Sequence, residues 1–280
     1  MPEQPFLRRV FVYVVILVGL TPMFYFSAVE FGIAEVSAQT DSGQAIVRGP
    51  ADRYVENLAF GVGEKLTFEV NFGFINAGTA TMEVADLIEF RQRPCYQIVT
   101  RANSNSFFSS IYKVEDRVES IIDAAGIFSW RFEKELHEGS YRSHRMYVFD
   151  QENHFVVYKD DTIPIEPYVH DALSPLYFLR TQPLEIGKSI MLDNFVDGQK
   201  LHLEIKVLKK ERITVEAGTF DCILVEPVTA DVGIFKNQGR LRVWLTDDRL
   251  RLPVLMKSKI LVGSISAELI DFDLGELDEF

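Results

Sequence analysis

Residues 65–72, with the sequence KLTFEVNF, decide the fold class because polar and apolar side chains alternate at every position. A two-residue period places all of the apolar side chains on one face of a β-strand and the polar ones on the other. Such alternation is typical of an antiparallel sheet that has one face in the core and one in water. The stretch therefore predicts a half-buried strand.

The same period recurs along most of the chain. Residues 78–84 repeat it directly after a turn at residues 76–78. Short runs separated by turn signals predict antiparallel hairpins rather than βαβ units. The further strand candidates are residues 96–103, 116–123, 128–138, 140–150, 154–159, 189–195, 200–208, 214–217, 220–227, 240–246, 254–259 and 264–272.

Residues 171–182 are the best helix candidate. Asp171 can cap the start, an apolar stripe follows at helical spacing, and Pro183 ends the run. A second helical turn is predicted over residues 107–113. The overall balance is all-β with a minor helical part. A sheet of about a dozen strands must curl, close or split. We therefore expect a strongly curved antiparallel sheet or an incomplete β-barrel with one short helix packed on it.

The N-terminal segment has the pattern of an export signal. Arg8 and Arg9 precede the uncharged, largely apolar residues 10–29, and small residues follow at 36–38. Cleavage after Ala38 or Ala28 would release the chain. An uncleaved anchor is the alternative, because the apolar run approaches the ~20 residues that span a bilayer.

The chain accordingly divides into three predicted parts. Residues 1–38 are an export signal or signal anchor, 39–53 a flexible linker, and 54–280 a single β-rich domain. The net charge of −12 argues against nucleic acid as a partner and against electrostatic docking on anionic lipid. Cys95 and Cys222 could form a disulfide in an oxidising compartment, or remain two separate buried thiols.

Candidate binding residues fall into an acidic and basic cluster near Trp244 and a group of aromatic residues. The cluster of Asp247, Asp248, Arg249 and Arg251 could bind a sugar or a cation, or simply form a charged hairpin turn. The aromatic residues could belong to the core or line the mouth of an apolar cavity. The ten candidates are Phe72, Phe74, Phe107, Phe108, Tyr112, Trp244, Asp247, Asp248, Arg249 and Arg251.

Catalytic and metal motifs are missing from the sequence. It contains no Gly-x-Ser-x-Gly elbow, no phosphate-binding glycine loop and no zinc-ligand spacing, so we predict no catalytic residues, no metal site and no cofactor. His137, Arg142, His144 and Arg145 fall around one predicted turn. They could form a cationic spot for an anionic ligand, or lie on a solvated turn.

Three stretches resemble a known bacterial exported family, the domain of unknown function 3108. They are residues 63–70 (GEKLTFEV) with 77–80, residues 171–180 (DALSPLYFLR), and residues 243–249 (VWLTDDR) with 251–254 and 263–265. The resemblance implies an exported, β-rich envelope protein. Together with the N-terminal segment this predicts a protein of the bacterial periplasm, or one anchored to the inner membrane and facing the periplasm. It implies no catalytic residues.

The leading functional hypothesis is a non-enzymatic module that binds a lipidic or amphipathic envelope ligand on a curved sheet. One alternative is a structural or assembly factor that binds another envelope protein. A second is a glycan or lipid hydrolase built around Asp247 and Asp248. Membrane contact through the N-terminal segment is expected if that segment is not cleaved.

Overall fold

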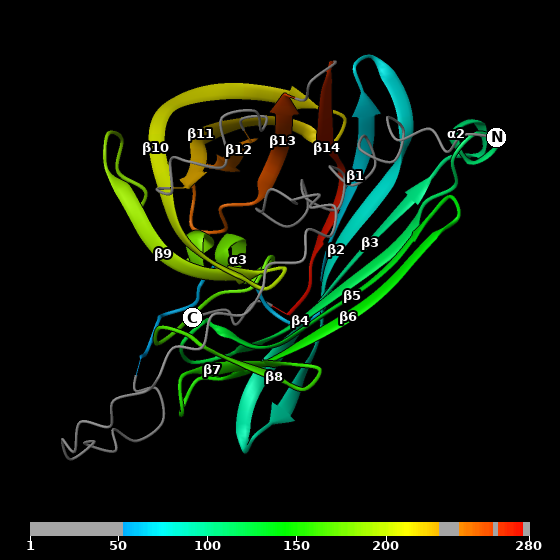
Figure 1. The fold of residues 1–280 in the computed structure, drawn as a ribbon. Coiled ribbons are helices and arrows are strands. Elements are labelled where there is room, and N and C mark those ends of the chain that lie inside the picture. The colour runs from blue at the N-terminus through cyan, green and yellow to red at the C-terminus, as the bar shows by residue number, and fades with distance from the viewer. Residues whose placement is uncertain (1–52, 230–240, 260–262, 277–280) are drawn as a thin grey trace, which may run out of the picture.

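The computed structural model describes residues 53–229, 241–259 and 263–276. These residues form fourteen strands and two short helices (Figure 1). The first half of the chain contributes β1 (Glu64–Phe72), β2 (Ile75–Phe90), β3 (Arg93–Ser104), α2 (Ser106–Ser109), β4 (Glu115–Asp123), β5 (Ser129–Glu138), β6 (Tyr141–Asp150), β7 (Phe155–Tyr158) and β8 (Asp161–Pro164). The second half contributes α3 (Ser174–Arg180), β9 (Ser189–Val196), β10 (Gln199–Val215), β11 (Gly218–Thr229), β12 (Leu241–Thr246), β13 (Pro253–Lys259) and β14 (Ser264–Leu274).

All fourteen strands belong to one antiparallel sheet. Its order is β8-β7-β6-β5-β4-β3-β2-β1-β14-β13-β12-β11-β10-β9, so β1 and β14 meet in the middle. Each half of the chain is thus a meander of hairpins: the first runs outward from β1 to the edge strand β8, and the second runs inward from the edge strand β9 to β14. The edge strands β8 and β9 do not pair with each other, which leaves the sheet strongly curved and not closed into a barrel. The predicted fold class is confirmed.

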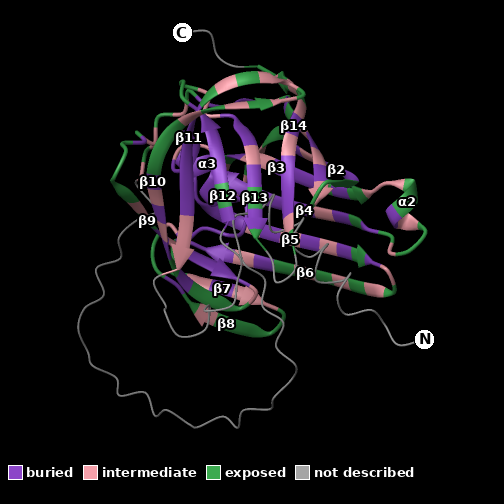
Figure 2. Ribbon diagram, turned by 90° about the horizontal axis from the view of Figure 1, so that it is seen from above, coloured by how far each residue is buried: buried purple, intermediate pink, exposed green. Residues whose placement is uncertain are grey.

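The alternation in residues 65–72 produces the inner face of β1. Leu66, Phe68 and Val70 are buried, whereas the residues between them are partly exposed. The same inner face continues through both halves into one apolar cluster that includes α3 (Figure 2). Because one face of the sheet carries this cluster, a register slip of one residue would turn it toward water.

The sheet curls until β9 packs over the inner face of β5 and β6. The Phe195 ring lies 5.7 Å from the Tyr147 ring and 6.1 Å from the Phe149 ring, measured between centroids. Beside these rings, Asp197 in the β9–β10 turn forms ion pairs with Lys134 and Arg145. These side-chain contacts join the two ends of the sheet together with backbone hydrogen bonds of His170, whose N–H donates to the Asp193 carbonyl and whose carbonyl accepts the Phe195 N–H, each at 2.8 Å.

Helix α3 lies on the concave side of the sheet (Figure 1), as the sequence predicts, but it is shorter than residues 171–182. Asp171 does not serve as its N-cap. Instead, Asp171 Oδ1 accepts the backbone N–H groups of Leu173 and Ser174, at 2.6 and 2.9 Å, and this turn delays the helix to Ser174. The second predicted helical turn also forms earlier and shorter than residues 107–113, as α2.

Two predicted strands, residues 200–208 and 214–217, are parts of the single 17-residue strand β10. Its pairing with β11 shifts between Val207 and Lys209, so Leu208 is the extra residue of a bulge. A bulge interrupts the two-residue period and looks like a strand end in the sequence. The short edge strand β8 was not predicted.

The export segment and nearly all of the predicted linker lie outside the described residues. Arg53, the last residue of the predicted linker, contacts the folded domain. Its guanidinium donates to the carbonyls of Gly126 and Ile127, at 2.7 and 2.9 Å, and lies over the Tyr168 ring. Neither helix of the described residues is long and apolar enough to cross a membrane.

Candidate functional site

The β1–β2 hairpin and α2 meet at one end of the sheet. Asn105 fixes this junction, because its Oδ1 accepts the Phe108 N–H at 3.0 Å while its Nδ2 donates to the Asn76 carbonyl at 2.7 Å. The Asn105 N–H also donates to the Ala77 carbonyl at 2.9 Å. A single asparagine thus caps the helical turn and holds it beside the hairpin.

Large apolar side chains project into water at this junction. Phe74 follows Gly73, whose φ of +62° makes the hairpin turn, and it is fully exposed. Ile75, Phe107 and Ile111 are 53%, 63% and 58% exposed. We call these four residues the apolar tip; Figure 2 shows α2 as a protruding segment at this end, with exposed and buried residues side by side.

The structure brings the five predicted aromatic residues to this same end, but in different environments. Phe108 is buried, and Phe72 and Tyr112 are half-buried against the core. The Tyr112 ring lies so close to Gly139 that a methyl group there would come within 2.8 Å of it. Only Phe74 and Phe107 face solvent, so the group forms a projecting tip supported by core aromatics.

The second predicted group forms a turn at residues 246–252. Asp248 Oδ1 accepts the Thr246 hydroxyl at 2.7 Å and the backbone N–H groups of Leu250 and Arg251 at 2.9 and 3.0 Å. Asp247 pairs with Lys210 at 2.5 Å. The two carboxylates therefore have separate structural partners, as in the hairpin interpretation, and they do not converge on one ligand position.

The remaining members of that group also have local roles. Arg251 donates to the Gln182 carbonyl at 3.1 Å, and Arg249 is exposed. Trp244 donates its indole N–H to Glu211 at 2.7 Å and packs with Cys222 in a small cluster separate from the main core. These contacts hold α3 and β10 to the turn.

The two predicted groups lie at opposite ends of the sheet. Strand β1 starts beside the 246–252 turn and ends at the apolar tip, and its nine residues span roughly 26 Å. A common ligand site built from all ten candidate residues is therefore not formed.

Cys95 and Cys222 are both free and buried, and they belong to two different clusters. The possible disulfide between them is thus absent. Burial raises the pKa of each thiol to about 12, so neither is a thiolate at neutral pH. Both behave as small apolar side chains.

The histidine and arginine residues around the β5–β6 turn do not form one cationic spot. His144 Nε2 contacts Glu133 Oε1 at 2.6 Å, whereas Arg145 points to the other face and pairs with Asp197 at 3.3 Å. Arg142 donates to the carbonyls of Gly139 and Tyr141. The four residues are not one group, because Arg145 lies on the inner face whereas His137, Arg142 and His144 share the outer face.

Sequence reasoning missed a buried ion pair that connects α3 with β1. Arg180 donates to both Glu64 oxygens at 2.7 and 2.6 Å, to the Ala59 carbonyl at 2.9 Å and to the Leu250 carbonyl at 3.1 Å. Both charged side chains are 1% exposed. Coulombic attraction to Glu64 helps to raise the pKa of Arg180 against the effect of burial. The sequence signal that could have indicated this ion pair was an arginine in an otherwise apolar helix.

This ion pair connects the three separate sequence stretches that carry the family resemblance. Glu64 comes from the first of them, Arg180 ends the second, and Leu250 lies within the turn of the third. The four hydrogen bonds of one guanidinium therefore fix the helix to β1 and to the 246–252 turn.

A second cluster that was missed surrounds the segment before α3. His170 Nδ1 lies 2.9 Å from Ser174 Oγ, which lies 2.8 Å from Ser129 Oγ. A histidine beside a serine hydroxyl can activate a nucleophile when substrate has access. Here both side chains are buried, and among the described residues His170 Nε2 has no hydrogen-bond partner. Burial holds the pKa of His170 well below its usual range. The cluster anchors the segment to β5.

Asp116 on β4 gives a prediction for the pH dependence of stability. Burial raises the pKa of this carboxyl to about 7, while the His137 N–H at 2.8 Å and the nearby Arg142 oppose the rise. The pKa of an aspartate in the unfolded chain is about 3.9. Between that pH and the folded-state pKa, the Asp116 carboxyl is therefore protonated in the folded state and ionised in the unfolded state. The stabilising contribution is therefore present in acid and is lost as the pH rises through about 7.

We expect the free energy of unfolding to fall from pH 4.5 to pH 8 by up to about 4 kcal/mol through this group. Asp116→Asn cannot ionise and should show a flatter profile. Urea unfolding of both proteins across this range measures the difference. Parallel profiles would mean that Asp116 titrates normally.

Comparison with known proteins supports the fold and the family. The structure resembles a β-barrel-like protein of the domain of unknown function DUF1849 from Brucella abortus, with 12% identity, a TM-score of 0.53, and 78% of this chain and 100% of that chain covered. A DUF1089 family protein from Pseudomonas aeruginosa matches with 8% identity, a TM-score of 0.39, and 65% and 90% covered. No curated protein matches the sequence.

The family model described as "Protein of unknown function (DUF3108)" matches residues 67–270. That range contains most of the sheet, the apolar tip, Arg180 and the 246–252 turn. This chain is therefore a member of the DUF3108 family.

Proposed function

We propose that this protein is a non-enzymatic, exported envelope module that binds a lipid surface through its apolar tip. The observation that carries the proposal is the full exposure of Phe74, together with three large apolar side chains that are more than half exposed on adjoining segments. Single exposed apolar residues are normal on a protein surface, whereas a contiguous group marks an interaction site.

The hairpin does not need these side chains in order to fold. Two-residue turns favour Gly, Asn or Asp, and Gly73 already supplies the positive φ. Phe74 therefore replaces a residue that would normally be polar. Because the tip projects from the body, it suits insertion between lipid headgroups better than the enclosure of a small ligand.

Apolar contact supplies the binding energy in this proposal. Burying the exposed parts of the four side chains would yield on the order of 5 kcal/mol before the cost of association. The net charge of −12 gives no attraction to anionic lipid, so binding should depend little on salt. The predicted N-terminal export segment would bring the domain to an envelope membrane.

A fluorescent probe on the tip tests the proposal. Both native cysteines are buried, so Ile111→Cys can be labelled selectively with an environment-sensitive fluorophore. We expect phosphatidylcholine vesicles to shift its emission to the blue. Adding Phe74→Ser and Phe107→Ser should abolish the shift, because the inserting rings are gone.

The matched control replaces two exposed apolar residues elsewhere, on β9 and in the turn before it. Ile186 and Met191 are 48% and 60% exposed, and their serine variants should leave the shift unchanged. The proposal fails if the probe does not respond to vesicles, or if the response survives the loss of both tip phenylalanines.

A further inference from the structure

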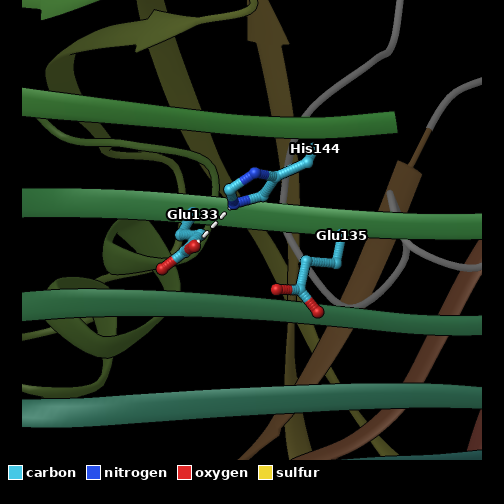
Figure 3. Close-up of side chains that lie close together, drawn as sticks. All are labelled: Glu133, Glu135 and His144. Atoms are coloured by element: carbon cyan, nitrogen blue, oxygen red, sulfur yellow. Dashed lines mark hydrogen bonds and ion pairs between the residues drawn. The ribbon is translucent and has the colours of Figure 1, made fainter. Parts of the chain in front are cut away.

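The outer face of β5 and β6 carries a histidine and two carboxylates in one group. Glu133 and Glu135 lie two residues apart on β5 and therefore project from the same face, and His144 on β6 is the register partner of Glu135. One ligand atom from each of the three residues lies within 4.8 Å of the others. Figure 3 shows the three side chains together, with His144 in contact with Glu133.

We propose that Glu133, Glu135 and His144 form a binding site for a divalent transition-metal ion of the Zn²⁺ class. Imidazole nitrogen and carboxylate oxygen are both donors that Zn²⁺ accepts, and a site with three protein ligands leaves a fourth position open for water or a partner's ligand. Ca²⁺ fits less well, since it takes six to eight oxygen ligands. Imidazole selects ions such as Zn²⁺, Cu²⁺ and Ni²⁺ over Mg²⁺.

The contacts around the group favour a cation. The His144 nitrogen that contacts Glu133 Oε1 at 2.6 Å is the atom that would bind the metal, so a short adjustment brings both donors to one ion. The two nearest arginines are shared with Glu119, and one of them also pairs with a carboxylate of the site. Both Arg117 and Arg131 form ion pairs with Glu119, and Arg131 lies 3.9 Å from Glu133. Among the described residues Glu135 forms no ion pair, so its carboxylate is available to the ion even though Arg117 is its register partner on β4.

The site is accessible and is held by rigid elements. The His144 side chain is 59% exposed and the Glu133 side chain is 19% exposed, so an ion can enter from solvent without any rearrangement of the sheet. All three residues lie on paired central strands rather than on loops. None of them belongs to the apolar tip, so this proposal stands or falls independently of lipid binding.

Isothermal titration of the full-length, tag-free chain with ZnCl₂ in detergent tests the site. We expect saturable binding of one ion, undisturbed by millimolar Mg²⁺. His144→Ala and Glu135→Gln should each weaken it by more than about tenfold, because each removes a ligand. Both side chains lie on the surface, and circular dichroism will verify that the variants remain folded.

His202→Ala is the matched control. His202 also contacts one carboxylate, Asp193, at 2.6 Å, and its side chain is 60% exposed, but the described residues place no second carboxylate in a ligand group with it. This variant should bind Zn²⁺ as the unchanged protein does. The proposal is overturned if the unchanged protein shows no saturable binding, or if His202→Ala weakens binding as much as His144→Ala.

Discussion

Arg180→Met is expected to lower the free energy of unfolding by about 3–5 kcal/mol, the largest effect that we predict for a single substitution. The variant leaves the Glu64 carboxylate buried without its partner, and it also removes the donors to the Ala59 and Leu250 carbonyls. Methionine keeps an unbranched apolar stem of similar shape and lacks the guanidinium end, so most of the loss should come from the missing charge and hydrogen bonds. Urea unfolding followed by the fluorescence of the buried Trp130 measures the change.

The double variant Glu64→Gln with Arg180→Met separates the ion pair from the shape of the site. It removes both buried charges, so it should be clearly more stable than Arg180→Met alone. Arg180→Lys keeps the charge but cannot form the two-pronged contact with Glu64, and it should fall between the unchanged protein and Arg180→Met. Equal unfolding midpoints for Arg180→Met and the unchanged protein would show that Arg180 does not stabilise the fold.

Asp171→Ala is expected to cost about 2–4 kcal/mol. Asp171 is completely buried and accepts hydrogen bonds from the Ser120 hydroxyl and from the backbone N–H groups of Leu173 and Ser174. Alanine would leave these donors buried without acceptors, at about 1–3 kcal/mol for each group that stays unsatisfied. Burial raises the pKa of Asp171, so part of the loss is offset because a costly buried carboxyl is also removed.

Two companion variants make this result specific. Asp171→Asn keeps an oxygen for the two N–H groups and should cost less than Asp171→Ala. Asp160→Ala changes an exposed aspartate between β7 and β8 and should stay within about 0.5 kcal/mol of the unchanged protein. If Asp171→Ala and Asp160→Ala unfold alike in urea, the turn before α3 does not depend on the Asp171 side chain.

The sequence was sufficient to predict the fold class because a half-buried strand shows a direct alternation of polar and apolar residues. Leu66, Phe68 and Val70 alternate with polar neighbours and occupy the inner face of β1 as expected. The pattern misleads where a local exception interrupts it. Leu208 is a bulge residue and makes one long strand look like two. Asp171 looks like a helix cap but forms the preceding turn.

The candidate site was harder to predict because it depends on contacts between distant residues. The aromatic residues near the tip could be named, but exposure separates Phe74 and Phe107 from the buried Phe108, and no local pattern determines exposure. The partner of Arg180 is 116 positions away, at Glu64. His144 meets Glu133 only because the β5–β6 register places it there. Each of these pairings is a product of the sheet topology.

Iodide quenching of a probe at position 111, compared with the same probe at position 191, tests lipid binding by the apolar tip most directly. Both positions are exposed apolar residues of the folded protein, but only Ile111 belongs to the tip. We predict that vesicles will shield the probe at position 111 from iodide and leave the probe at position 191 fully quenched. Equal quenching at position 111 with and without vesicles, or equal shielding at both positions, would contradict the account.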